Sequence, residues 1–126
     1  MPTSLLRVLV VGCGNMGASH ATAYHHHPSF EICGLVSPGT SKERLNAKLG
    51  TTYPLYDTYT TALAETRPDA VCISTYPDTH EEYALQAIAA GCHVFIEKPL
   101  ADSVAGAERV MDAALKADKK VVVGYI

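Results

Sequence analysis

The stretch Arg7-Val8-Leu9-Val10-Val11-Gly12-Cys13-Gly14-Asn15-Met16-Gly17 decides the fold of this chain. The apolar run 8–11 is typical of a strand that is buried on both faces of a sheet. Three glycines with the spacing G-x-G-x-x-G follow the run directly, and a helical pattern begins at Gly14. A glycine-rich turn between a buried strand and a helix predicts the first half of a βαβ unit.

Short apolar runs and helical patterns go on alternating along the rest of the chain. This alternation predicts an α/β domain of three layers, a Rossmann fold whose doubly wound, mostly parallel sheet carries helices on both faces. The expected strands cover residues 7–11, 31–36, about 52–55, 70–74, 93–96 and 120–124. The expected helices cover residues 14–25, 42–49, 59–65, 79–90 and 103–117.

Capping residues mark several helix ends. Thr79 and Glu82 have the spacing of a capping box, which predicts that the fourth helix begins at Thr79. Thr40 stands in the same place before the second helix, and Ser103 is expected to cap the last one. Gly50 is expected to end the second helix in a left-handed conformation.

Length and composition limit the class of protein. The chain has 126 residues, which corresponds to one domain, and its 48% apolar and 18% charged residues are typical of a globular fold. Ten Lys and Arg against thirteen Asp and Glu give a net charge of −3 without a basic stripe, so no nucleic-acid surface is expected. No apolar run approaches the ~20 residues of a membrane helix, so no membrane contact is expected either.

Cysteine and histidine patterns give no sign of a disulfide or a metal site. The four cysteines at positions 13, 33, 72 and 92 form no Cys-x-x-Cys pair, which predicts free thiols and a reducing, cytoplasmic compartment. The run His25-His26-His27 cannot converge on one ion, because consecutive helix positions point about 100° apart. We therefore expect an exposed helix end before Pro28 and no metal.

The glycine motif predicts a dinucleotide site. Gly12 permits the tight turn, Gly14 the close approach of a pyrophosphate, and Gly17 the close packing of helix on strand. The first amides of the helix then bind the phosphates. The alternative is a glycine-rich turn that binds no ligand.

Ser37 stands where NAD-binding domains carry the carboxylate that binds the adenosine ribose. No carboxylate follows until Glu43, whereas Lys42 and Arg44 supply cations beside hydroxyl groups and a helix start. This chemistry favours a 2′-phosphate, so NADP is the expected cofactor and NAD the second candidate. The alternative is an ordinary capped helix with surface Lys and Arg.

Two further polar stretches come at the carboxyl ends of expected strands, where open α/β sheets bind ligands. One is Ser74-Thr75-Tyr76-Pro77-Asp78-Thr79-His80, and the other is Glu97-Lys98-Pro99. Lys98 could hydrogen-bond the reacting oxygen of a substrate, with the neighbouring carboxylate fixing its position. The alternatives are a His80 that only packs and a Lys98 that is an ordinary surface lysine.

The order of these motifs resembles the glucose–fructose oxidoreductase, inositol dehydrogenase and rhizopine-catabolism (Gfo/Idh/MocA) family, over residues 7–125. The Glu-Lys-Pro triplet is the most specific part. The resemblance implies that the phosphates meet Gly12, Asn15 and Met16, the adenosine end Ser37 and Lys42, and the ribose linkages Thr75, Pro77 and His80. It further implies that Glu97 and Lys98 lie beside the nicotinamide, and that Lys98 is the catalytic residue that polarises the substrate hydroxyl or carbonyl during hydride transfer.

Members of that family continue past Gly124-Tyr125 into a second α+β domain with the substrate pocket and the usual catalytic histidine or aspartate. Residues 1–126 are therefore expected to be the NAD(P)-binding domain of an oxidoreductase acting on sugars, cyclitols or related polyols, without turnover of its own. The alternative is a non-catalytic dinucleotide-binding module, either a cofactor sensor or a subunit of a split enzyme. A purely structural domain would leave Glu97-Lys98-Pro99 unexplained. An uncovered crevice and the apolar pair Tyr125-Ile126 predict self-association, such as a homo-oligomer, or a partner chain.

Overall fold

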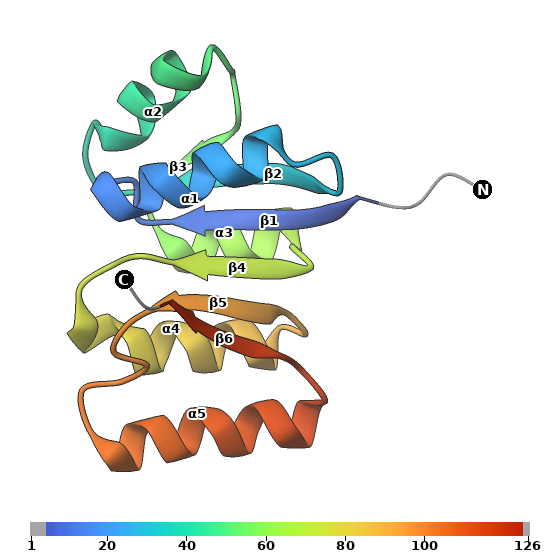
Figure 1. The fold of residues 1–126 in the computed structure, drawn as a ribbon, viewed down its shortest axis with the longest axis vertical. Helices are drawn as coiled ribbons and strands as arrows, with labels where there is room; N and C mark the ends of the chain where they lie inside the picture. The colour runs from blue at the N-terminus through green and yellow to red at the C-terminus, as the bar shows by residue number, and fades with distance from the viewer. Residues whose placement is uncertain (1–4, 125–126) are drawn as a thin grey trace.

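A computed structural model describes residues 5–124 as a single sheet flanked by helices (Figure 1). The strands are β1 (Leu6–Val11), β2 (Phe30–Val36), β3 (Leu55–Tyr56), β4 (Ala70–Ile73), β5 (His93–Glu97) and β6 (Val121–Gly124). The helices are α1 (Asn15–His26), α2 (Ser41–Leu49), α3 (Tyr59–Thr66), α4 (Pro77–Ala89) and α5 (Val104–Ala117). The order of elements is the one expected from the sequence.

All strand pairs are parallel, and the order across the sheet is β3-β2-β1-β4-β5-β6. The direction of winding reverses between β1 and β4, which makes this the Rossmann arrangement that the sequence predicts. The arrowheads of β1, β4 and β5 point to the same edge of the sheet (Figure 1). Ligands of open parallel sheets bind outside this carboxyl edge, at the point of reversal.

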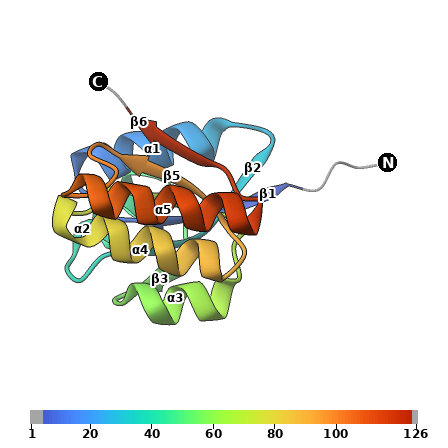
Figure 2. The same ribbon diagram turned by 90° about the horizontal axis from the view of Figure 1, so that it is seen from below.

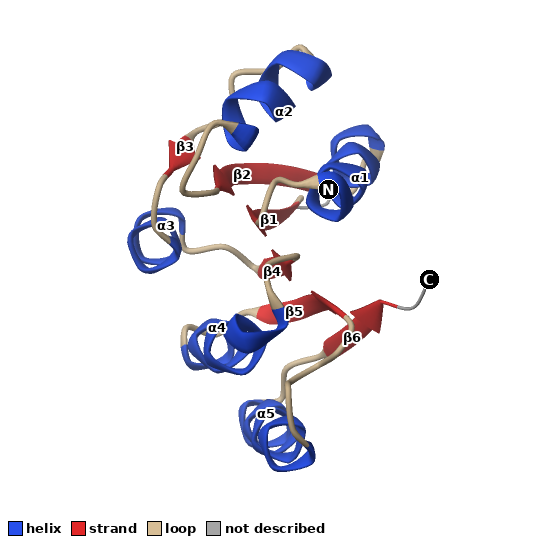
Figure 3. Cartoon of the chain, turned by 90° about the vertical axis from the view of Figure 1, so that its left-hand side faces the viewer, coloured by secondary structure: helices blue, strands red, loops and turns tan. Residues whose placement is uncertain are grey.

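Two hydrophobic layers cover the two faces of the sheet. Val10 packs with Ala21 of α1 and Leu45 of α2, whereas Leu9 and Val11 pack with residues of α3, α4 and α5 on the other face. Figure 3 shows α1 on one side of the strands and α3 and α4 on the other. Residues 8–11 are at most 1% exposed, which explains why this strand is continuously apolar.

Helix α5 packs alongside α4 (Figure 2). Because α1 lies over β1 and β2, the opposite face of β5 and β6 is left with little helical cover. Val122 of β6 is 54% exposed, and its register partner Phe95 of β5 is only half-buried. Tyr125 and Ile126, which the sequence analysis singles out as an apolar end, lie outside the described residues.

The predicted start of α4 is wrong, whereas the predicted cap of α5 is confirmed. Helix α4 begins at Pro77 with Tyr76 as its cap residue, so Thr79 and Glu82 lie inside the helix and form no capping box. The fixed φ of proline suits the first helical position, and it moves the start ahead of Thr79. Ser103 caps α5 as expected and accepts a hydrogen bond from the Gly106 amide at 3.0 Å.

The second helix follows its prediction in part. Thr40 is the cap residue of α2, but its side chain makes no capping hydrogen bond. Gly50 ends the same helix with a φ of 68°, the left-handed conformation expected for it.

Within residues 5–124 no helix is long and apolar enough to cross a membrane. The same residues contain no cluster of three His, Cys, Asp or Glu side chains that could hold a metal ion. The four cysteines are buried free thiols.

Candidate functional site

The glycine turn between β1 and α1 is shaped by close backbone contacts. Gly12 has a φ of 96°, and a Cβ atom there would lie 2.5 Å from the Ser74 carbonyl oxygen. A Cβ atom on Gly17 would lie 1.8 Å from the Gly12 carbonyl oxygen. Both positions therefore need glycine for the fold itself. Gly14 differs, because a Cβ atom there would meet nothing within 4 Å.

The turn presents free hydrogen-bond donors to the open space beside Gly14. Helix α1 begins after Gly14 without a side-chain hydrogen bond at its cap. The first amides of a helix have no partner inside the helix, and they carry the positive end of its dipole. The hydroxyl of Ser74, at the end of β4, is buried without a hydrogen-bond partner. These groups fit a phosphate-containing ligand.

Five of the eleven predicted site residues meet in one cleft. Met16, Thr75, Pro77, Glu97 and Lys98 line a cleft of about 470 Å³ at the carboxyl edge of β4 and β5. Ser74 lines the cleft too, and its buried hydroxyl has no hydrogen-bond partner. Three segments that are far apart in the sequence thus form one wall.

A second cleft, of about 380 Å³, adjoins the first, and Thr75 lines both. Gly12, Ser37, Pro38 and Asp57 also line it. Ser37 is buried, and its hydroxyl donates to the Gly39 carbonyl oxygen at 3.4 Å. We refer to the two adjoining clefts together as the crevice, which lies at the edge where β1 meets β4 and where open α/β sheets bind dinucleotides.

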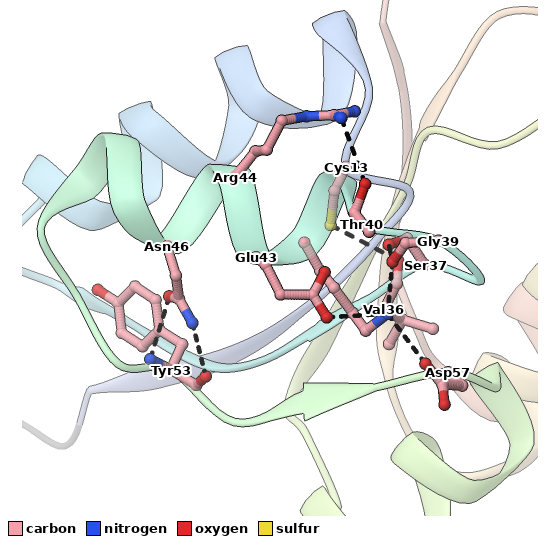
Figure 4. Close-up of polar contacts among 11 residues, drawn as sticks. Cys13, Val36, Ser37, Gly39, Thr40, Glu43, Arg44, Asn46, Tyr53 and Asp57 are labelled. Carbon is pink, nitrogen blue, oxygen red and sulfur yellow. Dashed lines mark hydrogen bonds and ion pairs between the residues drawn. The ribbon is translucent and has the colours of Figure 1, made fainter.

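Lys42 does not lie in either cleft as a free cation. Its side chain is only 6% exposed, and its Nζ donates to the Gly39 carbonyl oxygen at 2.6 Å. The same Nζ lies 2.9 Å from Asp57 Oδ1 and 3.7 Å from Glu43 Oε1. The hydrogen bond to Asp57 raises the pKa of Lys42 above its ordinary value, although partial burial acts the other way. Figure 4 shows Gly39, Glu43 and Asp57 around this contact.

Arg44 is an exposed cation near the start of α2. Its guanidinium donates to Thr40 Oγ1 at 3.3 Å. It lines a shallow cleft of about 230 Å³ together with Gly14, Asn15 and Lys48, which is also exposed. Ser41 lines this cleft too, so the starts of α1 and α2 and two cations border the same space.

His80 is the other predicted site residue that the structure keeps out of the clefts. It is 1% exposed, with Nδ1 2.6 Å from the Pro99 carbonyl oxygen and Nε2 3.0 Å from the Thr75 carbonyl oxygen. Its side chain therefore ties the loop after β4 to the loop after β5. This geometry gives His80 a positioning role rather than a contact with a ligand in the clefts.

Two residues that the sequence analysis missed support the predicted ones. His20 Nε2 of α1 contacts the Glu97 carboxylate, and its ring lies 4.7 Å from that of Phe95. His20 follows Met16 by four positions and so shares its helix face, which was a usable signal. Asp57 gave no such signal. It follows the strand Leu55–Tyr56, and a strand of two residues is too short to be located precisely from an apolar pattern.

Comparisons with known proteins identify the family of this chain. Residues 6–125 match the family model described as "Oxidoreductase family, NAD-binding Rossmann fold" (Gfo/Idh/MocA). Inositol 2-dehydrogenase of Agrobacterium fabrum (strain C58 / ATCC 33970) is 34% identical over 124 residues, which are 96% of this chain and 37% of that protein. D-glucoside 3-dehydrogenase of Escherichia coli (strain K12) is 30% identical over 94% of this chain and 34% of its own length.

Solved structures share the fold. The crystal structure of GenD2 from gentamicin A biosynthesis in complex with NAD is 32% identical, with a TM-score of 0.87 over 96% of this chain and 34% of that one. The chain thus spans little more than a third of these relatives. The match over almost every residue from β1 to β6 shows that this chain belongs to the Gfo/Idh/MocA oxidoreductase family and is its NAD-binding Rossmann domain.

Proposed function

We propose that residues 1–126 are the cofactor-binding domain of an oxidoreductase that transfers hydride between a nicotinamide dinucleotide and a sugar, cyclitol or related polyol. The observation that carries this proposal is the single crevice that joins the glycine turn to Glu97 and Lys98. Relatives named as inositol and D-glucoside dehydrogenases support the polyol class of substrate.

Different residues along the crevice are proposed to bind different parts of the cofactor. The turn at Gly12 and Gly14 and the first amides of α1 bind the pyrophosphate. Met16, Thr75 and Pro77 form the apolar and hydroxyl wall toward Glu97. A bound nicotinamide dinucleotide supplies the hydride donor or acceptor.

Lys98 is the proposed catalytic residue. Lys98 lines the crevice, and we expect its amino group to donate a hydrogen bond to the substrate oxygen and to stabilise the charge that develops there. Glu97 is buried beside it, and the contact with His20 holds the Glu97 carboxylate in place. The proposed roles pair the exposed cation of Lys98 with the buried carboxylate of Glu97 at the same end of the crevice.

Both cofactors are candidates, and we propose NADP as the preferred one. The absence of a carboxylate at Ser37 and the exposed Arg44 beside the α2 start support the 2′-phosphate. Because Asp57 already balances the charge of Lys42, we expect a preference below about tenfold rather than the larger margin of a free cation.

The compartment is proposed to be the cytoplasm. All four cysteines are free and buried, and none is positioned as part of a disulfide. Free thiols of this kind are typical of proteins kept in a reducing environment.

Binding of the reduced cofactors tests the proposed function. NADH and NADPH are titrated into the purified chain, and binding is followed by cofactor fluorescence. We expect saturable binding of both at one site. A chain that is folded by circular dichroism and binds neither cofactor would overturn the proposal. Binding together with a failure of every polyol to perturb the bound cofactor would favour the non-catalytic module instead.

A further inference from the structure

The geometry points to Asp57 as a residue that sets the choice between NAD and NADP, by holding Lys42 in an ion pair and opposing a 2′-phosphate. This inference rests on the proposed function, since it concerns the adenosine end of the same crevice. It assigns the discriminating carboxylate to the residue after β3, whereas Rossmann domains ordinarily carry it at the end of β2.

Asp57 is placed to act on that end of the cofactor. It lines the same cleft as Gly12 and Ser37, so it belongs to the wall where the adenosine ribose is expected. The Ser37 amide donates to the Tyr56 carbonyl oxygen at 3.1 Å, which fixes Asp57 directly beside the end of β2. Its side chain is 79% exposed and thus open to a ligand.

The ion pair with Lys42 explains how the Asp57 carboxylate weakens the attraction of a 2′-phosphate. Lys42 reaches the loop through its bonds to Gly39 and Asp57, and almost none of its side chain is exposed. Its positive charge is therefore compensated within the protein. A 2′-phosphate entering beside Ser37 meets the Asp57 carboxylate together with a cation that is already paired, so the net attraction is small.

Replacing Asp57 tests how its charge affects the binding of the two cofactors. Asp57→Asn keeps the size of the side chain but removes its charge, so Lys42 loses its nearer carboxylate and keeps only the longer, 3.7 Å contact with Glu43. We expect the affinity for NADPH to rise about tenfold, while the affinity for NADH stays within about threefold. Both affinities are measured by fluorescence titration of the purified full chain, which requires no turnover.

Lys42→Met is the complementary variant. It leaves Asp57 unpaired, so the affinity for NADPH is expected to fall about tenfold with little change for NADH. In the double variant the effect of Asp57→Asn on NADPH should be smaller than in the wild-type background, because no lysine is left to release. An equal effect in both backgrounds would overturn the role of the ion pair.

Asp112→Asn on the exposed surface of α5 is the matched control, since it changes the net charge equally at a distant place. It should leave both affinities unchanged. If Asp57→Asn binds both cofactors with the wild-type ratio and an unchanged melting temperature, this inference is wrong and the proposed function stands. If the wild-type chain binds neither cofactor, the proposed function itself fails.

Discussion

The glycines of the motif do not share one role. Gly12 and Gly17 are required by backbone atoms of the protein, at 2.5 Å and 1.8 Å from the missing side chain. Gly14 has an ordinary φ of −74° and open space around it. A side chain at Gly14 therefore costs the fold little, but it occupies the volume proposed for the pyrophosphate.

Valine substitutions separate the two roles. We expect Gly14→Val to fold with a near-wild-type melting temperature and to lose about tenfold to a hundredfold in NADPH affinity, as removal of charge-assisted hydrogen bonds does. Circular dichroism and fluorescence titration check these outcomes. Gly17→Val is the matched comparison and should fail to fold. Undiminished binding by Gly14→Val would show that the phosphates lie elsewhere.

Residues whose roles follow from local sequence were predictable, and those whose partners lie far along the chain were not. The glycine turn is defined within six residues, so its conformation was readable. The partner of His20 is Glu97, 77 positions away, and Lys42 meets Asp57 across two separate elements. The sequence therefore indicated a free Lys42, because only the folded chain brings the opposing carboxylate beside it.

The order of the helices and strands could be predicted from the sequence, but not every helix start could. The order of strands and helices was predictable from apolar periodicity, which is strong over long segments. The start of α4 was not, because two signals compete there and Pro77 prevails over the Thr79 and Glu82 spacing.

The capping bond of α5 makes a testable contribution to stability. Ser103→Ala removes the acceptor for the Gly106 amide, and we expect a loss of about 1 kcal/mol in the free energy of unfolding, or about 4 °C in melting temperature. Thr40→Ala is the control, since Thr40 makes no capping bond to α2. Equal losses from the two substitutions would contradict this account of the helix starts.

Buried thiols couple the stability of the whole molecule to alkaline pH. Burial raises the pKa of Cys13 and Cys92 to about 11 and that of Cys72 to about 12. In the unfolded chain these thiols ionise near pH 8.5. Unfolding therefore releases protons above that pH, so their contribution is complete below about pH 8.5 and is lost as the pH rises toward 11–12.

We expect the melting temperature to fall steadily from about pH 8.5 to 11. Burial also raises the pKa of Tyr24 and Tyr59, which adds to the fall above about pH 10. Calorimetric scans across this range measure the effect, with Cys92→Ala as a variant of shallower slope. A flat profile between pH 8.5 and 11 would contradict the assigned environments.

The uncovered end of the sheet bears on activity. Val122 is exposed on one face of β6, and Lys98, which lines the cleft at the carboxyl edge of β4 and β5, is exposed as well. Hydride transfer needs a substrate held close and shielded from water. We expect the 126-residue chain saturated with cofactor to turn over inositols, glucose and other sugars far below the ~1–1000 per second of ordinary enzymes. Absorbance of the reduced cofactor measures this, and a rate within that range would reveal a complete active site.

The buried His80 links two loops of the crevice. Its imidazole lies within hydrogen-bond distance of the Thr75 and Pro99 carbonyl oxygens, so the loop after β4 and the loop that carries Lys98 share one contact. A substitution that removes this imidazole is therefore expected to loosen both loops together rather than one of them alone.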